Sequence, residues 1–351
     1  MKYSFKDFFK DLYHTEGQKF AYTAKSEEEF SVWKERFRKG LSTQLGLERL
    51  ERIGKGMGKQ EPLLLEEAKE EGYVRRKYAL ETLPKVFMPF YMLIPDCVQD
   101  GNAARAVIAV PAHGANKNTV CGVISSTAEQ RKIDETPAEC YGKKIAQAGY
   151  VVFCPDPPGY GERAETGGSS LDSSCRDLSQ TSEALGLSLT ALEIWELQRL
   201  LDFACHTPYL AADESGPRIG CVGFSGGGRS CMWLAAMDDR IRLAVVSGYV
   251  HGYFDSILSC HFCPCNFAPR LWTLGDISDI CSLIAPRPLF IENGIQDGNN
   301  GPRGIEGPKE QVKKIREAYE LLGKSELLIH NMPEGGHKWY GECYQFLDEN
   351  L

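Results

Sequence analysis

The chain has 351 residues, which is enough for one large α/β domain with additions or for two smaller domains. Its formal net charge is −8, with 48 Asp and Glu against 40 Lys and Arg, and the basic residues form no dense stripe. This balance argues against nucleic acid or an anionic membrane surface as a partner. Hydrophobic residues make up 42% of the chain and charged residues 25%, a balance typical of soluble globular proteins.

The first ten residues are interrupted by charges, so the start of the chain does not resemble a signal peptide. No window approaches the roughly 18 apolar residues that a membrane-spanning helix needs. The 13 cysteines are an odd number, which favours reduced thiols and a cytoplasmic location. The run from Cys260 through Cys263 to Cys265 could hold a soft metal. No second cysteine pair follows at zinc-finger spacing, so we expect ordinary thiols, with no metal and no other cofactor.

The N-terminal part of the sequence predicts helices. Between residues 30 and 45, apolar side chains recur every three or four positions with charges between them, which is typical of an amphipathic helix. We therefore expect residues 1–70 to form a helical N-terminal extension packed on a core domain of residues 71–351.

The core domain begins with two predicted strands, 73–80 and 86–94, joined as a hairpin by residues 82–85. Apolar strands and amphipathic helices then alternate, which predicts an α/β fold with a mostly parallel central sheet and helices on both faces. The predicted strands are 104–111, 150–155, 219–224, 243–247, 288–292 and 326–331, and the predicted helices are 140–148, 185–204, 309–322 and 338–351. Residues 250–280 are irregular, and we expect an insertion there over the carboxyl edge of the sheet, where α/β proteins bind ligands.

Residues 223–227 read Gly-Phe-Ser-Gly-Gly, between a predicted strand and a helix. This Gly-x-Ser-x-Gly pattern is typical of a nucleophile elbow, a sharp turn that exposes the serine hydroxyl. Glycine at positions 223 and 227 tolerates the unusual dihedral angles and the close approach of backbone that such a turn requires. The backbone N–H groups and dipole of the following helix would stabilise negative charge near the hydroxyl. Ser225 is therefore the candidate nucleophile.

A serine hydroxyl needs a base to accept its proton, and after a nucleophile elbow the acid and then the histidine follow along the chain. Asp297 lies in a glycine-flanked turn just past a predicted strand, and His337 lies in a Gly-Gly loop after the next one. We interpret His337 as general base and then general acid, and Asp297 as the carboxylate that orients it. Glu292, at the strand end, is the alternative acid, because Asp297 could be only a turn residue.

An oxyanion hole needs two backbone N–H groups aimed at one point. The first predicted donor is Gly226, directly after the nucleophile. The second comes from the loop after strand 104–111, which contains a His-Gly pair. We assign this donor to Gly114 or Ala115, and we expect His113 to be a structural loop residue.

Together these motifs resemble the α/β-hydrolase superfamily, in particular its branch of dienelactone-hydrolase-like and acetyl xylan esterase-like proteins. The resemblance covers roughly residues 30–351 and rests on the elbow, the Gly-Gly-His337 sequence and the stretches 156–163 and 284–289. It implies a metal-independent hydrolase of carboxylic esters, often of acetylated or feruloylated carbohydrate. Two differences stand out. Dienelactone hydrolases use a cysteine where this chain has Ser225, and the cephalosporin-deacetylase type has Arg-Gly-Gln-Gly where this chain has Pro-Gly-Tyr-Gly.

We therefore expect a cytoplasmic serine esterase that acts on small acetylated or feruloylated carbohydrate esters through an acyl-enzyme on Ser225. A serine peptidase on the same fold and a non-catalytic ligand binder are the alternatives. The acyl group, the alcohol and the oligomeric state stay open, and a homo-oligomer is compatible with the sequence. Aromatic residues near the insertion could line an acyl or sugar pocket, although packing is their commoner role; they are Tyr249, Tyr253, Phe254, Phe262, Phe267 and Trp272.

Overall fold

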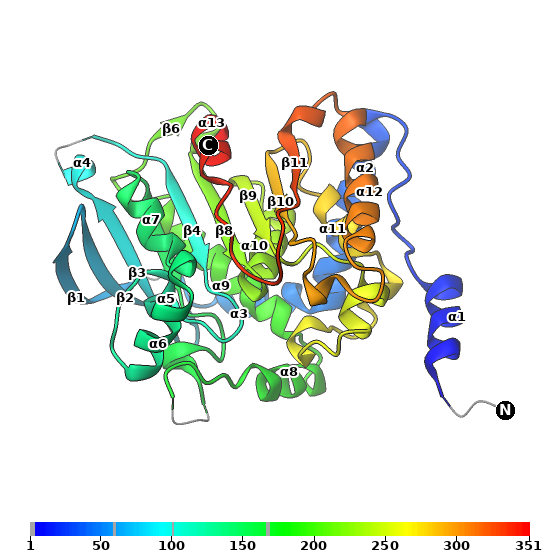
Figure 1. Ribbon diagram of the computed structural model, residues 1–351, viewed down its shortest axis with the longest axis horizontal. Coiled ribbons are helices and arrows are strands. Elements are labelled where there is room, and N and C mark those ends of the chain that lie inside the picture. Colours follow the sequence, from blue (N-terminus) through cyan, green and yellow to red (C-terminus); the bar gives the residue numbers. More distant parts are fainter. Residues whose placement is uncertain (1–3, 59–60, 100–101, 166–168) are drawn as a thin grey trace.

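The computed structural model describes residues 4–58, 61–99, 102–165 and 169–351. Its centre is a nine-stranded sheet in the order β1-β2-β3-β5-β4-β8-β9-β10-β11 (Figure 1). The pairs β1–β2, β2–β3 and β3–β5 are antiparallel, and all the other pairs are parallel. The strands are β1 (Leu63–Glu70), β2 (Tyr73–Leu83), β3 (Val86–Pro95), β4 (Ala106–Val110), β5 (Val151–Pro155), β8 (Ile219–Phe224), β9 (Ile241–Ser247), β10 (Leu289–Glu292) and β11 (Leu328–Asn331), while β6 (Ala212–Asp213) and β7 (Gly216–Pro217) form a separate small hairpin.

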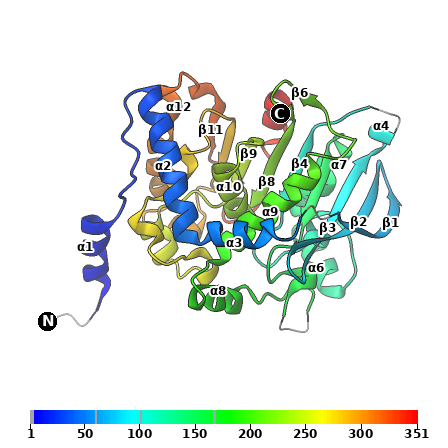
Figure 2. The ribbon, with the colours of Figure 1, turned by 180° about the vertical axis from the view of Figure 1, so that it is seen from behind.

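Helices cover both faces of the sheet, as Figures 1 and 2 show from opposite sides. The long ones are α2 (Glu27–Leu45), α9 (Leu189–Ala204), α10 (Gly226–Met237) and α12 (Glu306–Leu321). The shorter ones are α1 (Lys6–Glu16), α3 (Leu47–Lys55), α4 (Asp96–Gln99), α5 (Lys117–Val120), α6 (Thr127–Glu135), α7 (Tyr141–Gln147), α8 (Cys175–Ala184), α11 (Ile277–Ser282) and α13 (Tyr344–Asn350). None of these described helices has the length and apolar character needed to cross a lipid bilayer.

The central strands are apolar along their whole length because both of their faces are covered. All five residues of β4 are buried, and alternate residues enter different hydrophobic clusters. Ile108 packs in the cluster that contains residues of α2, α9 and α10, whereas Val107 and Ala109 pack in the cluster that contains residues of α7 and α13. The strand period of two thus distributes one apolar run over two cores. This arrangement confirms the predicted mostly parallel sheet with helices on both faces.

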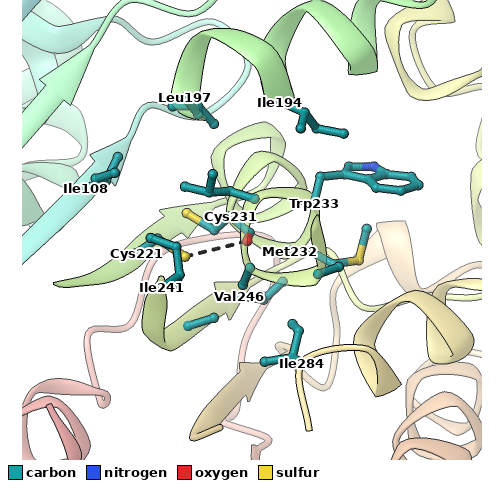
Figure 3. Packing of buried hydrophobic residues seen from close by; sticks show 14 of the residues in the cluster. Ile108, Ile194, Leu197, Cys221, Cys231, Met232, Trp233, Ile241, Val246 and Ile284 are labelled. Carbon is teal, nitrogen blue, oxygen red and sulfur yellow. Dashed lines mark hydrogen bonds between the residues drawn. The ribbon is translucent and has the colours of Figure 1, made fainter. Parts of the chain in front are cut away.

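The larger core lies directly behind the predicted elbow. Figure 3 shows Met232 and Trp233 of α10 among side chains of α9 and of the neighbouring strands. The thiol of Cys221 in β8 donates a hydrogen bond to the carbonyl of Cys231 at 3.5 Å, which links strand and helix. Close packing on both sides of β8 holds the turn between β8 and α10 rigidly.

The individual elements agree with the sequence-based expectations at some positions and differ at others. The predicted hairpin is confirmed, since β2 and β3 pair antiparallel up to Leu83 opposite Val86. The prediction of helix is wrong for Leu63–Glu70, because this segment folds back on β2 as edge strand β1 through a turn at Gly72 (φ 89°). The predicted helix 185–204 begins only at Leu189, where Ser188 caps α9 by accepting from the Ala191 N–H. The predicted helix 338–351 begins only at Tyr344.

The segment 250–280 is irregular, as predicted, and consists of short helical turns before α11. Aromatic side chains from it meet at the side that faces α1. Tyr253 stacks on Trp272 with ring centroids 5.5 Å apart, and Tyr13 of α1 contacts both Phe254 and Trp272. Packing is therefore the role of these aromatic residues of the segment. The division into an N-terminal extension and a core domain stays a prediction.

Candidate active site

The turn between β8 and α10 is strained at a single residue. Ser225 has φ 53° and ψ −117°, a backbone conformation that residues other than glycine rarely adopt. A Cβ on Gly223 would lie 2.3 Å from the carbonyl oxygen of Gly227, and a Cβ on Gly227 would lie 2.1 Å from the carbonyl oxygen of Val110. Both distances are far inside van der Waals contact, so only glycine fits at either position. The pattern Gly-x-Ser-x-Gly therefore has the structural cause that the sequence predicted.

The structure brings Ser225, His337 and Asp297 together. Nε2 of His337 lies 2.9 Å from Oγ of Ser225, and Nδ1 of the same ring lies 2.7 Å from Oδ2 of Asp297. The His337 side chain is 29% exposed and the Asp297 side chain 1%, so the carboxylate lies behind the ring and is shielded from water. The Phe224 ring packs on the imidazole with centroids 4.7 Å apart, which restricts its rotation.

The carboxylate of Asp297 is held in its ionised form. Burial raises its pKa, but the hydrogen bond and charge of His337 and the N–H of Asn299, 2.8 Å from Oδ1, outweigh burial and bring the net pKa below its ordinary value. An ionised carboxylate can only accept hydrogen bonds, so Nδ1 of His337 is the donor. In the neutral ring Nε2 is then free to accept the proton of the Ser225 hydroxyl.

Glu292, the alternative acid, is directed elsewhere. Its carboxylate accepts hydrogen bonds from Oγ of Ser247 at 2.8 Å, Nδ2 of Asn331 at 3.2 Å and the N–H of Tyr340 at 3.3 Å. These partners tie β10 to β9, to β11 and to the loop before α13. The geometry favours Asp297, because its oxygen meets the His337 ring and those of Glu292 are engaged by other groups.

The predicted oxyanion loop lies against the elbow. A Cβ on Gly226 would lie 2.9 Å from the backbone nitrogen of His113, so the loop after β4 touches the start of α10. The Ala115 N–H donates to the carbonyl of Ala112 at 3.0 Å, so Ala115 is not free to be the second donor. Among the described residues, the N–H groups of Gly226, Gly114 and His113 have no hydrogen-bond acceptor. From the sequence we expected His113 to be only a structural loop residue. No sequence pattern indicated that its backbone would lie against Gly226.

A cavity of about 510 Å³ opens in front of Ser225 and His337. One wall is the segment after β9, including Tyr249, just before the predicted insertion, and Phe262 within it. That the insertion covers the site stays a prediction. Polar and charged groups occupy other walls. They are Lys132, Thr136 and Glu139 near α6, Asn266 and Asn299 from later loops, and Arg229 from α10.

Arg229 is a cavity residue that sequence reasoning missed. It lies one helical turn after Ser225, is 3% exposed, and forms an ion pair with buried Glu193 of α9. Its guanidinium also donates to the carbonyl of Cys265 in the insertion. This buried pair joins α9, α10 and the cavity wall, and removing one partner would leave an uncompensated charge in the interior.

The stretch 156–163 has a structural role. Asp156, which is fully buried at the end of β5, accepts from the N–H and from Nζ of Lys117, each at 2.8 Å. Arg163 forms two hydrogen bonds with the carboxylate of Glu196, at 2.6 and 2.7 Å. A Cβ on Gly161 would lie 2.6 Å from the Asp156 carboxylate. The motif therefore fastens the loop after β5 to α5 and α9 beside the cavity.

Comparison with known proteins places these features in a wider context. A family model described as the Abhydrolase family matches residues 8–253. A curated protein of Bacillus subtilis named "Putative hydrolase YtaP" is 25% identical over 197 residues, which are 52% of this chain and 57% of that protein. The chain thus matches little more than half the length of this relative.

Solved structures share the fold at low identity. A "putative acetyl xylan esterase" from Bacteroides fragilis superposes with a TM-score of 0.74 at 18% identity, covering 95% of this chain and 83% of that one. A glucuronoyl esterase from Solibacter usitatus superposes with a TM-score of 0.65 at 13% identity, covering 95% of each chain. These similarities confirm the predicted α/β-hydrolase fold.

Proposed function

The chain belongs to the Abhydrolase family, and on this premise we propose that it is a serine hydrolase of carboxylic esters. The observation that carries the proposal is the series of hydrogen bonds from Ser225 through His337 to Asp297. Ser225 and His337 line a cavity. A nucleophile, a base and a buried carboxylate in contact are the arrangement that acyl transfer needs.

The proposed reaction proceeds in two halves. Oγ of Ser225 attacks the ester carbonyl carbon while Nε2 of His337 takes the hydroxyl proton. The bond from the carbonyl carbon to the alcohol oxygen then breaks, Nε2 returns the proton to the leaving alcohol, and the acyl group stays esterified to Ser225. In the second half Nε2 takes a proton from water as the water attacks the acyl carbon. The carboxylic acid leaves and Ser225 regains its proton from His337. Asp297 stabilises the imidazolium in both halves.

Negative charge that develops on the carbonyl oxygen needs donors near Ser225. The N–H of Gly226 at the first position of α10 is the proposed first donor, because the helix dipole adds to its effect. The proposed second donor is an N–H of the loop after β4, from Gly114 or His113. Loss of one such donor costs about 10²–10³ in rate.

The substrate class that we propose is a small ester of a polar alcohol, such as acetylated or feruloylated carbohydrate. The cavity volume of about 510 Å³ lies in the usual range for small-molecule sites. Aromatic faces at Tyr160, Tyr249 and Phe262 suit a sugar ring or an aromatic acyl group, and Asn299 offers hydrogen bonds to hydroxyl groups. Structural similarity to proteins named as carbohydrate esterases supports the same class. We also propose a cytoplasmic location, supported by 13 cysteines that all lie in the described residues and form no disulfide.

The test uses p-nitrophenyl acetate and a panel of acetyl, butyryl, feruloyl and glucuronoyl esters. The wild type should hydrolyse p-nitrophenyl acetate and react with a fluorophosphonate probe, and Ser225→Ala should lose about 10⁴–10⁶ in kcat together with labelling. Ser215→Ala, at an exposed serine in the small β6–β7 hairpin, is the matched control and should keep both. Near-full activity in Ser225→Ala would refute the proposal, and faster cleavage of aminoacyl-naphthylamides than of esters would favour a peptidase.

A further inference from the structure

Four side chains from three separate segments converge beside the cavity. They are His113 of the loop after β4, Cys175 at the start of α8, and Cys263 and Cys265 of the insertion. Nε2 of His113 lies 3.4 Å from Sγ of Cys175, which lies 3.6 Å from Sγ of Cys263. The four ligand atoms all lie within 4.8 Å of one another. We call this group the Cys3His cluster.

The two shortest contacts in the cluster have the lengths expected between ligands of a tetrahedral metal centre. With a Zn–S bond of about 2.3 Å and a Zn–N bond of about 2.0 Å, tetrahedral angles place two sulfurs about 3.8 Å apart and sulfur and nitrogen about 3.5 Å apart. The two distances measured in the cluster are each within about 0.2 Å of these values. We propose that the Cys3His cluster binds one zinc ion.

The ligand set favours zinc over harder cations and over a disulfide. Three thiolates with one imidazole are a common donor set of structural zinc sites, whereas magnesium and calcium prefer oxygen. A disulfide would join two of the three sulfurs and leave the third, with His113, unused. The cluster also has an outer layer of donors, as metal sites require. Nδ2 of Asn266 donates to Sγ of Cys265 at 3.5 Å, and Arg229 donates to the carbonyl of the same residue.

Cys260 is separate from this cluster although it belongs to the same sequence motif. Its thiol donates to the carbonyl of Gly298 at 3.5 Å, and it is not among the four converging ligands. Of the three cysteines in the sequence motif, Cys263 and Cys265 belong to the cluster. Its third cysteine, Cys175, lies 88 positions before Cys263. Cys260 therefore serves as an internal control.

The position of the zinc ion defines its role. Four protein ligands leave no open position for water or substrate, so the ion is structural. It would join the loop that carries the proposed oxyanion donors, the start of α8 and the wall of the cavity that contains Phe262. The inference stands on the cluster alone and does not rest on the proposed esterase activity.

The test measures metal on the untagged, reduced full-length chain, independently of activity. Elemental analysis of the protein purified without chelator should give one zinc per chain. The metal-free protein should take up one equivalent of Zn²⁺ in competition with a chromophoric chelator, and Co²⁺ should produce a thiolate-to-cobalt charge-transfer band. Cys175→Ser should weaken Zn²⁺ binding by more than about 10²-fold, while Cys260→Ser should leave stoichiometry and affinity unchanged.

Two results would overturn the inference. One is reduced wild-type protein that binds no Zn²⁺ in the competition assay, which needs no variant to fold. The other is Cys260→Ser losing the metal to the same extent as Cys175→Ser. If Cys175→Ser is too unstable to purify, the Co²⁺ spectrum of the wild type still decides, because it reports sulfur ligands directly.

Discussion

Replacing the carboxylate of Asp297 by an amide isolates its role, because Asp297→Asn changes one atom and little of the packing. Oδ1 of Asp297 accepts from the Asn299 N–H at 2.8 Å, and this contact fixes which end of the new amide keeps the oxygen. The NH₂ group must then face Nδ1 of His337, where the carboxylate oxygen now lies at 2.7 Å. Because the amide donates there, Nδ1 becomes the acceptor and Nε2 carries the proton. Nε2 can then no longer take the proton of Ser225.

The expected loss in kcat for Asp297→Asn is about 10⁴-fold, or about 5 kcal/mol of transition-state stabilisation. The assay is steady-state hydrolysis of p-nitrophenyl acetate, with the rate of fluorophosphonate labelling as a second readout. The matched control is Glu292→Gln, at the neighbouring carboxylate that bonds Ser247 and Asn331. It should keep kcat within about tenfold of the wild type. A large loss in Glu292→Gln together with near-normal activity in Asp297→Asn would refute the reasoning.

Two further predictions concern stability, measured by urea unfolding. Gly227→Ala should lower the free energy of unfolding by about 3 kcal/mol or more, because its Cβ would lie 2.1 Å from the carbonyl oxygen of Val110. The control Gly298→Ala should lower it by less than about 1 kcal/mol, because nothing beyond its chain neighbours lies within 4 Å of the new Cβ. Equal losses in the two variants would contradict the steric argument. Burial lowers the pKa of His251 to about 4, so between that value and the unfolded pKa near 6.5 only the unfolded chain gains this proton. The free energy of unfolding should therefore be unaffected by His251 above about pH 6.5 and should fall by about 3 kcal/mol as pH falls toward 4. His251→Gln should abolish this pH-dependent fall, and an unchanged pH dependence in that variant would contradict the reasoning.

Local patterns in the sequence predicted the elements near Ser225 well. The strand before Ser225 is found where the sequence predicted it, because it is encoded by a short apolar run. A helix follows Ser225, as predicted, but it begins at Gly226 and so includes the glycines, two of which leave room for neighbouring backbone. Less local features were predicted less well. Leu63–Glu70 became strand β1 because it pairs with β2, and α9 begins at Leu189 because Ser188 caps it. Pairing and capping of this kind depend on partners that a single segment does not contain.

The sequence by itself determined the order of Ser225, Asp297 and His337 and the type of fold, since alternating apolar strands and helices admit few arrangements. Only the tertiary structure decided which carboxylate meets the imidazole, because Asp297 and Glu292 lie five positions apart and their side chains are directed at different partners. Tertiary structure alone also brought Cys175 and His113 to Cys263. These residues are far apart along the chain, and contacts between distant segments depend on how the strands and helices pack together.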